Sequence, residues 1–211
     1  MAPIHMPAFL VADIRVINRE KYDDYRRRFR TCVAQHRGRF LARGQEVQVI
    51  QGGWHPPRML LVEFADSADA SAMLASEEYR ELELSRGNCA MFDIVIVEGL
   101  ETSKYTGREI RPVYAIADAR IVNRAAFEEF RARIDAAVRE HDGRYLALAE
   151  KVDTVAGNWA PTFISIMEFS SPEAANRAYK ASGYLEVRER GNNAAMIDMV
   201  MLSGEAPDAL P

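Results

Sequence analysis

Cysteine is scarce in this sequence, and long hydrophobic runs are missing. Only two of the 211 residues are cysteine, which excludes a disulfide framework. Both lie in apolar-periodic surroundings, where a free thiol behaves as a small hydrophobe, so we predict core positions for Cys32 and Cys89. No run approaches the roughly 18 to 20 apolar residues of a membrane span, and the first seven residues have no signal-peptide pattern. We therefore expect a cytoplasmic protein without a membrane partner.

An excess of charge of one sign is also missing. The formal net charge is −4, and the 27 Lys and Arg residues are interspersed with the 31 Asp and Glu residues. No basic stripe is present that could follow a phosphate backbone. Nucleic acid is therefore not an expected partner.

Motifs for metal and cofactor chemistry are absent as well. The four His residues form no closely spaced metal-binding set, and no Cys pair supplements them. No complete glycine-rich phosphate loop follows a predicted strand, and no serine stands in a nucleophile-elbow pattern. We therefore expect no metal and no cofactor. A haem needs an axial ligand, and His36 or His141 could provide one only by facing a cavity.

An internal repeat is the strongest signal that is present. Shifting the chain against itself by 105 positions aligns residues 7–99 with residues 112–204 without a gap, and about 29 of about 93 pairs are identical. Matched residues of the first copy include Ala12, Asp13, Arg15, Asn18, Arg19, His36, Gly38, Arg39, Leu41, Gly52, Trp54, Pro56, Glu63, Phe64, Met91 and Asp93. We predict two units, at residues 7–100 and 112–205, joined by a polar linker at 101–111.

Each copy has the pattern of a βαββαβ unit. The predicted strands of the first copy are residues 9–16, 40–50, 59–64 and 91–97. Helices are expected to begin after the capping residues Asn18 and Asp66 in the first copy, and Asn123 and Ser171 in the second. Gly38 and its counterpart are expected to end the first helices in the left-handed conformation. This order predicts the α+β class and a ferredoxin-like unit.

Alternating residues in the first strand define two faces of each sheet. The face with Leu10 and Ile14 is expected to meet the helices, whereas the other face combines apolar residues with Asp13 and Arg15. Because helices cover one face only, we predict that the open faces of the two units pack together as an intramolecular α+β barrel. The charged residues on the open face lead us to expect a ligand cavity between the two sheets.

The repeated segments resemble the family called domain of unknown function 1330. The segments that carry the resemblance are the strand with Asp13 and Arg15, His36-Arg37-Gly38-Arg39-Phe40, His141-Asp142-Gly143-Arg144-Tyr145, the two Gly-x-Trp turns and the two Glu-Phe pairs. The resemblance implies a dimeric α+β barrel, in which two ferredoxin-like units face each other. Most members look like single-unit homodimers, so this chain is expected to be a monomeric pseudo-dimer that is able to associate further. Activity is not implied, because such barrels include cofactor-free monooxygenases, haem degraders, isomerases and stress-response proteins.

Twelve residues are candidates for a functional site. Candidates for acid–base catalysis are His36, His141, Asp13, Asp118, Glu63 and Glu168. Candidates for substrate binding are Arg15, Arg120, Trp54, Trp159, Asp93 and Asp198. Imidazoles titrate near neutrality, carboxyls in apolar cavities have a raised pKa, and guanidinium groups anchor anions. Structural alternatives stay open: helix-end stabilisation for the His residues, ion pairs for each Asp and Arg, and packing for the Trp residues.

Two classes of function remain. The first is a cofactor-independent enzyme that acts by acid–base chemistry on an oxygenated or carboxylated metabolite, as an isomerase, a cyclase, a lyase or a lactone-forming or lactone-opening enzyme. The second is a barrel that binds a small ligand, or serves a stress response, without turnover. A cofactor-free or haem-dependent monooxygenase is a further alternative. Charged groups on an apolar face favour the enzyme, since they are costly unless paired or used.

The two copies differ next to their tryptophans. His55 and Arg58 in the first copy correspond to Ala160 and Phe163 in the second. The first copy is therefore more cationic at this point. If both copies carry a pocket, the first is expected to prefer anions.

Overall fold

The structure, a computed structural model, describes residues 6–101, 111–183 and 194–205. Most of the predicted linker at 101–111 lies outside these residues. The same is true of most of residues 182–191, the counterpart of the last helix of the first unit.

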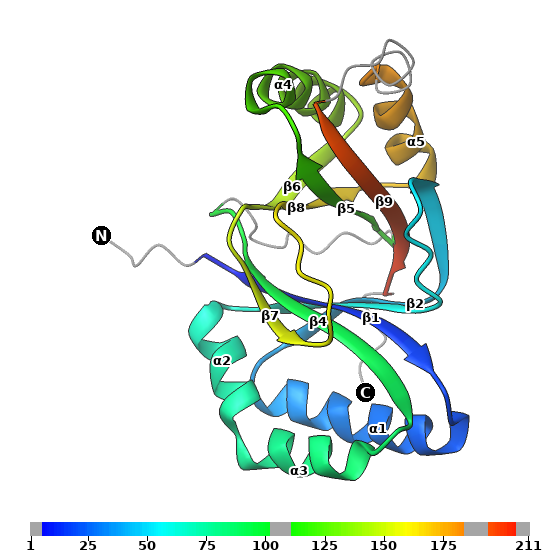
Figure 1. The fold of residues 1–211 in the computed structure, drawn as a ribbon, viewed down its shortest axis with the longest axis vertical. Helices are drawn as coiled ribbons and strands as arrows, with labels where there is room; N and C mark the ends of the chain where they lie inside the picture. Colours follow the sequence, from blue (N-terminus) through cyan, green and yellow to red (C-terminus); the bar gives the residue numbers. More distant parts are fainter. Residues whose placement is uncertain (1–5, 102–110, 184–193, 206–211) are drawn as a thin grey trace.

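The first unit has the predicted βαββαβ order, with its second helical segment divided in two (Figure 1). Its elements are β1 (Ala8–Val16), α1 (Arg19–Gln35), β2 (Arg39–Gln51), β3 (Met59–Phe64), α2 (Ser67–Ala75), α3 (Glu77–Arg86) and β4 (Ala90–Glu98). The predicted α+β class and ferredoxin-like order are confirmed.

The second unit repeats this order with one change. Its elements are β5 (Val113–Ile121), α4 (Arg124–Glu140), β6 (Gly143–Ala149), β7 (Val152–Ala156), β8 (Ile164–Phe169), α5 (Pro172–Ala181) and β9 (Ala195–Gly204). Two strands, β6 and β7, therefore stand where the first unit has the single long strand β2.

The predicted helix starts are confirmed by side-chain caps. The side chain of Asn18 accepts a hydrogen bond from the backbone N–H of Lys21 at 3.0 Å, and Asn123 caps α4 in the same way. Asp66 and Ser171 cap α2 and α5. Each cap satisfies a backbone donor that the helix cannot satisfy itself.

The helix ends differ from the expectation. The positive φ angles belong to Arg37, at 58°, and Asp142, at 55°, and not to the glycines that follow them. Gly38 is needed for space, because a Cβ there would lie 2.6 Å from a side-chain carbon of Val33. Gly143 is equally crowded. These glycines therefore permit close packing of helix and strand and do not supply the left-handed turn.

The two units form one nine-stranded antiparallel sheet that nearly closes on itself. Its order is β6-β8-β5-β9-β2-β3-β1-β4-β7. The far half of β2 leaves its own unit and pairs with β9, where Val47 lies opposite Leu202. In return β7 pairs with β4, where Val152 lies opposite Val97. Figure 1 shows β2 beside β9 and β7 beside β4. The predicted intramolecular barrel is confirmed, and backbone hydrogen bonds join its halves.

The helices α1, α2 and α3 cover one outer face, and α4 and α5 cover the other (Figure 1). Leu10 and Ile14 pack with residues of α1, as predicted from the strand alternation. On the inner face Phe9, Val11 and Tyr114 are at most 1% exposed. Burying each side chain of this kind contributes about 1.5–3 kcal/mol. The inner faces therefore account for the association of the two units.

The two cysteines are buried and free, as expected for core residues. None of the described helices is long and apolar enough to cross a membrane.

Candidate functional site

The space between the two sheets is filled, which corrects the expectation of a ligand cavity there. Leu61, Ile116 and Ile166 are fully buried in a continuous cluster that draws on both units. Large aliphatic and aromatic side chains from the two inner faces pack against one another there, as side chains do in protein interiors. A cavity among the described residues lies on the opposite side of the first sheet.

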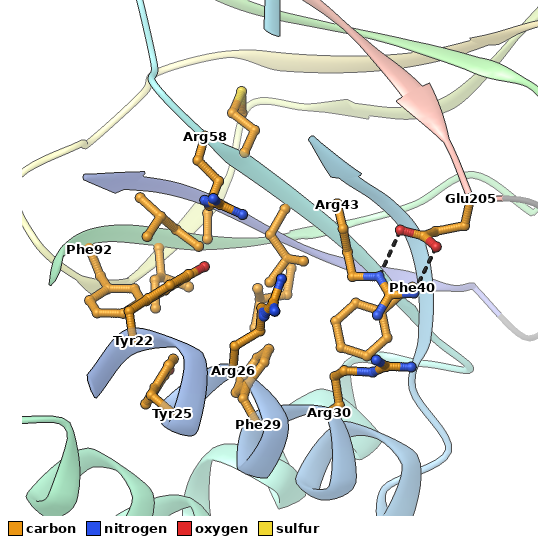
Figure 2. A pocket seen from close by; sticks show the side chains of 16 residues that line it. Tyr22, Tyr25, Arg26, Phe29, Arg30, Phe40, Arg43, Arg58, Phe92 and Glu205 are labelled. Carbon is orange, nitrogen blue, oxygen red and sulfur yellow. Dashed lines mark hydrogen bonds and ion pairs between the residues drawn. The ribbon is translucent and has the colours of Figure 1, made fainter. Parts of the chain in front are cut away.

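This cavity has a volume of about 250 Å³ and lies between α1 and the outer face of the first sheet (Figure 2). Its aliphatic and thioether lining comes from β1, β3 and β4: Leu10, Ala12, Ile14, Met59, Leu60 and Ile94. Its rings come from α1, β2 and β4: Tyr22, Tyr25, Phe29, Phe40 and Phe92. The rings contact one another, with centroid separations of 5.1–6.4 Å. The lining is therefore mostly apolar, with five aromatic rings among its sixteen residues.

Four arginines complete the lining. Arg26 and Arg30 lie one turn apart on α1, Arg43 lies on β2, and Arg58 directly precedes β3. The guanidinium carbon of Arg58 lies 5.2 Å from the ring centroid of Tyr22. Figure 2 shows Arg26 and Arg58 extending toward the same space from helix and strand. A guanidinium stacked on a ring keeps its N–H groups free to bind an anion at the ring's edge.

The arginines are only partly neutralised. Glu205 accepts two hydrogen bonds from Arg43, both of 2.7 Å. Arg26 pairs with Asp23 at 3.2 Å, but both side chains are 46% exposed, so this pair is weak. No acidic group among the described residues lies within ion-pair distance of Arg58. The cavity therefore carries an excess of positive charge.

The two tyrosines of the cavity are hydrogen-bond donors at neutral pH. Burial raises the pKa of Tyr25 and of Tyr22 above the usual value near 10, although Arg58 and Arg26 oppose the rise for Tyr22. Their hydroxyl groups therefore stay protonated beside the arginines.

The equivalent space in the second unit is filled. Phe163 replaces Arg58, is only 7% exposed, and meets the ring of Phe127 edge-on at 5.2 Å. Asp135 and Leu148 stand where the first unit has two of its other arginines. The space that remains there, beside α4 and α5, is lined by the counterparts of four residues of the first cavity, Ala115, Ile134, Ile197 and Met199. It measures only about 40 Å³, which is little more than the volume of one water molecule. In the described residues, the cationic cavity is thus a property of the first unit.

The predicted tryptophans and aspartates do come together, but where the two units meet. The rings of Trp54 and Trp159 lie 4.9 Å apart. The indole N–H of Trp54 donates to Asp13 at 3.0 Å, and that of Trp159 donates to Asp118 at 2.8 Å. Each unit therefore contributes the same pair to one shared contact.

The two other predicted aspartates hold the loop of the opposite unit. Asp93 accepts hydrogen bonds from the backbone N–H groups of Asn158 and Trp159, at 2.6 and 3.0 Å, and Asp198 accepts the equivalent bonds from the first unit's loop. Gly157 has a φ of 81°, and a Cβ on it would overlap the Asp93 carboxylate. The Gly-x-Trp turn is thus explained by contact between units.

Burial is the main cause of the raised pKa of both Asp13 and Asp118. The hydrogen bond from each tryptophan opposes this rise, and the negative charge of the neighbouring Asp93 or Asp198 adds to it. The pattern is the one expected of an acid, but both carboxyls already have a protein partner.

Glu63 and Glu168 each lie opposite an arginine on the adjacent strand. Arg144 donates to the two carboxylate oxygens of Glu168 at 3.1 and 3.2 Å, and Glu168 is 4% exposed. Arg39 donates to Glu63 from two of its guanidinium nitrogens. These contacts join neighbouring strands within each unit.

The remaining predicted residues lie at the ends of elements. His36 and His141 are half-buried C-caps of α1 and α4, and Arg15 and Arg120 are exposed. Among the described residues, none of the twelve candidates lines the cationic cavity. Their catalytic and binding roles stay predictions.

The residues that do line the cavity were mostly missed. Only Arg58 was singled out, because it differs from its counterpart Phe163. The same signal, a change of residue class between aligned copies, also marks Arg30 and Arg43.

Haem does not fit this cavity. Haem iron takes an axial ligand from His, Cys, Met or Tyr, and the lining includes no His or Cys among the described residues. Burial disfavours the phenolate form of Tyr22 and Tyr25, and Met59, the methionine of the lining, is fully buried and also packs in the core between the sheets. No step is therefore derived through haem.

The comparison with known families is clear. The family model for a domain of unknown function, DUF1330, matches residues 7–100 and again residues 112–205. The chain belongs to the DUF1330 family. It carries two copies of the DUF1330 domain in tandem. Among curated proteins, none matches the sequence significantly.

Solved structures resemble this DUF1330 protein over nearly its whole length. An anthrone oxidase-like protein matches with a TM-score of 0.54 and 14% identity, covering 99% of this chain and 96% of the other. A mutant chlorite dismutase from Candidatus Nitrospira defluvii matches at 0.51 and 11%, covering 92% and 91%. A haem-binding protein from Thermus thermophilus matches at 0.50 and 9%, covering 95% and 91%. At these identities the likeness shows the dimeric α+β barrel fold alone.

Proposed function

We propose that the first unit binds a small aromatic metabolite that carries an anionic oxygen, and that it acts on this metabolite as a cofactor-independent enzyme. The observation that carries the proposal is the group of four arginines around a cavity rich in aromatic rings in the first unit, three of which are replaced in the second. A volume of about 250 Å³ falls just below the roughly 300–1,000 Å³ of drug-sized pockets. The ligand is therefore a compound of one or two rings.

The lining favours chemistry in which negative charge develops on a ligand oxygen. Arg58 and the protonated hydroxyl of Tyr22 supply donors for a carboxylate, or for a carbonyl oxygen that becomes an enolate when a conjugated ligand loses a proton at its far end. Donors that are fixed before the reaction stabilise such charge more than mobile water does. Glu205 is the carboxylate of the described lining that could accept the proton, once its pair with Arg43 opens.

Binding without turnover is the second candidate function, and the ion pair between Arg43 and Glu205 supports it. Arg43 occupies both oxygens of Glu205, so the closed pair offers no free base, while Arg58 at the other side of the cavity can still bind an anion. The enzyme and the binding protein would bind the same class of ligand, but only the enzyme would transfer a proton.

The experiment separates binding from turnover. Aromatic carboxylates and ketones of one or two rings are titrated into the full chain by calorimetry. Arg58→Phe, which copies the second unit, is expected to weaken binding at least about tenfold, since a charge-assisted hydrogen bond is lost. Phe163→Leu is the matched control and should leave affinity unchanged.

Turnover is followed by mass spectrometry in D2O. Deuterium that enters the ligand only with the wild-type protein supports the enzyme, and tight binding without exchange supports the binding protein. Equal affinity of wild type and Arg58→Phe for every compound would remove this cavity as the site.

A further inference from the structure

Glu205, a residue of the second unit, lines the first unit's cavity. The repeat places Leu100 at the equivalent position on the other side of the barrel, so the two positions can be compared. The backbone N–H of Glu205 donates to the carbonyl of Leu41 at 2.8 Å. At the matching place on the other side of the barrel, the N–H of Leu100 donates to the carbonyl of Leu146, also at 2.8 Å. The backbone contacts between units are therefore the same at both places.

The side chains at these two places differ. Glu205 forms its two hydrogen bonds with Arg43, and the two side chains are 23% and 21% exposed. The matching positions of the other half hold Leu100 and Leu148. Because the other half forms the same backbone contact with leucines at both positions, this contact does not require an ion pair. A partly buried ion pair is also no better for stability than apolar residues of similar size.

The ion pair gives the cavity two chemically different ends. The guanidinium of Arg43 is engaged by Glu205 and also lies 5.0 Å from the ring centroid of Phe40. A carboxylate has about four acceptor positions, so Glu205 can accept further hydrogen bonds. Figure 2 shows Arg58 and Tyr22 on one side of the cavity and the Arg43–Glu205 pair on the other. One end therefore offers donors, whereas the other adds an acceptor, Glu205, beside Arg43 and Arg30.

The geometry points to Glu205 as a specificity-determining residue that the second unit supplies to the first unit's site. It selects a ligand with a hydrogen-bond donor, a hydroxyl or an amino group, at the end opposite the anionic oxygen. This inference rests on the proposed function and narrows the ligand class to hydroxylated or aminated aromatic acids.

The test uses matched probes that differ in one group. Phenylacetate is compared with 4-hydroxyphenylacetate, and 2-naphthoate with 6-hydroxy-2-naphthoate, by calorimetry on the full chain. Wild type is expected to bind the better-fitting hydroxylated probe at least about tenfold more tightly than its partner, as for a hydrogen bond to a charged group. The double variant Arg43→Leu/Glu205→Leu copies the other half of the barrel. It should stay folded, keep binding the unsubstituted acid and lose the preference.

Glu205→Gln is the second variant, because it keeps the shape and removes the charge. Its preference for the hydroxylated probe should fall several-fold. Equal binding of both members of each pair by wild type would overturn the inference. So would a gain of affinity for both members in Glu205→Gln, which would make Glu205 a competitor of the ligand's anion.

Failure of the underlying function gives a different result. If Arg58→Phe weakens all probes while wild type shows no preference, the site stands and the role of Glu205 does not. If no probe binds, or if Arg58→Phe binds them all as wild type does, the proposed function is overturned and the inference falls with it.

Discussion

The first unit keeps an open cavity between its long helix and its sheet, whereas the second unit fills the same space. The long helices, the first strands and the helix caps of the two units correspond, so the difference arises mainly from side chains, above all Arg58 and Phe163. A homodimer must carry two identical cavities. A fused pair is free to keep one for a ligand and to pack the other for stability.

The largest effect is expected when the side chain that fills this space in the second unit is removed. Phe163→Ala is expected to lower the free energy of unfolding by about 3–5 kcal/mol, because it leaves a void in a packed cluster. Arg58→Ala, the matched change, should cost no more than about 1 kcal/mol, the value of its contact with the Tyr22 ring. Urea denaturation of both variants provides the measurement. Similar losses would mean that the two spaces are packed alike.

The contact between the units should instead behave symmetrically. Trp54→Phe and Trp159→Phe each remove an indole N–H from a half-buried carboxylate, and each should lower the free energy of unfolding by about 1.5–3 kcal/mol. The two losses should agree within about 0.5 kcal/mol, as measured by the same denaturation. Clearly different losses of stability in the two variants would show that the two copies also differ at this contact.

The smallest expected effect depends on pH. Because burial raises the pKa of Asp13, the folded protein binds more protons than the unfolded chain between the ordinary pKa near 3.8 and the raised one. Stability from this group is therefore lost as the pH rises through that window. Asp13→Asn removes the effect, so its free energy of unfolding relative to wild type should increase as the pH rises above the ordinary pKa near 3.8 and level off above the raised pKa.

Asp118→Asn is the matched variant and should follow the same curve, since its pKa is raised by the same causes. Thermal unfolding across this pH range, with heat capacities fixed by calorimetry, gives the comparison. A difference that shrinks as the pH rises would contradict the raised pKa.

Much of the fold was readable because it depends on local signals and on the repeat. Asn18 and Asn123 precede apolar residues at helical spacing, and alternation in β1 separates Leu10 from Phe9 correctly. The sequence does not show which face of the sheet holds the cavity. Alternation shows that both faces are apolar, but the free space depends on how side chains from distant segments fit together.

The roles of the predicted site residues show the same limit. Trp54, Asp13 and Asp93 were recognised as notable because both copies keep them, and the structure gives them partners at the contact between units. Identity between the two copies does not distinguish residues that hold the units together from residues that act on a ligand. Differences between copies were the better guide to the cavity, as Arg58 shows.

The exchange of β2 and β7 between the units also restricts how a ligand can enter and leave. Many two-lobed proteins admit ligands by hinge opening, but here such a motion would break the ladders of β2 with β9 and of β4 with β7. Access is therefore left to rotamer changes of long side chains such as Arg26, which is half exposed. Those changes take picoseconds to nanoseconds, so association with an anionic ligand should be fast and should slow as salt screens the arginines.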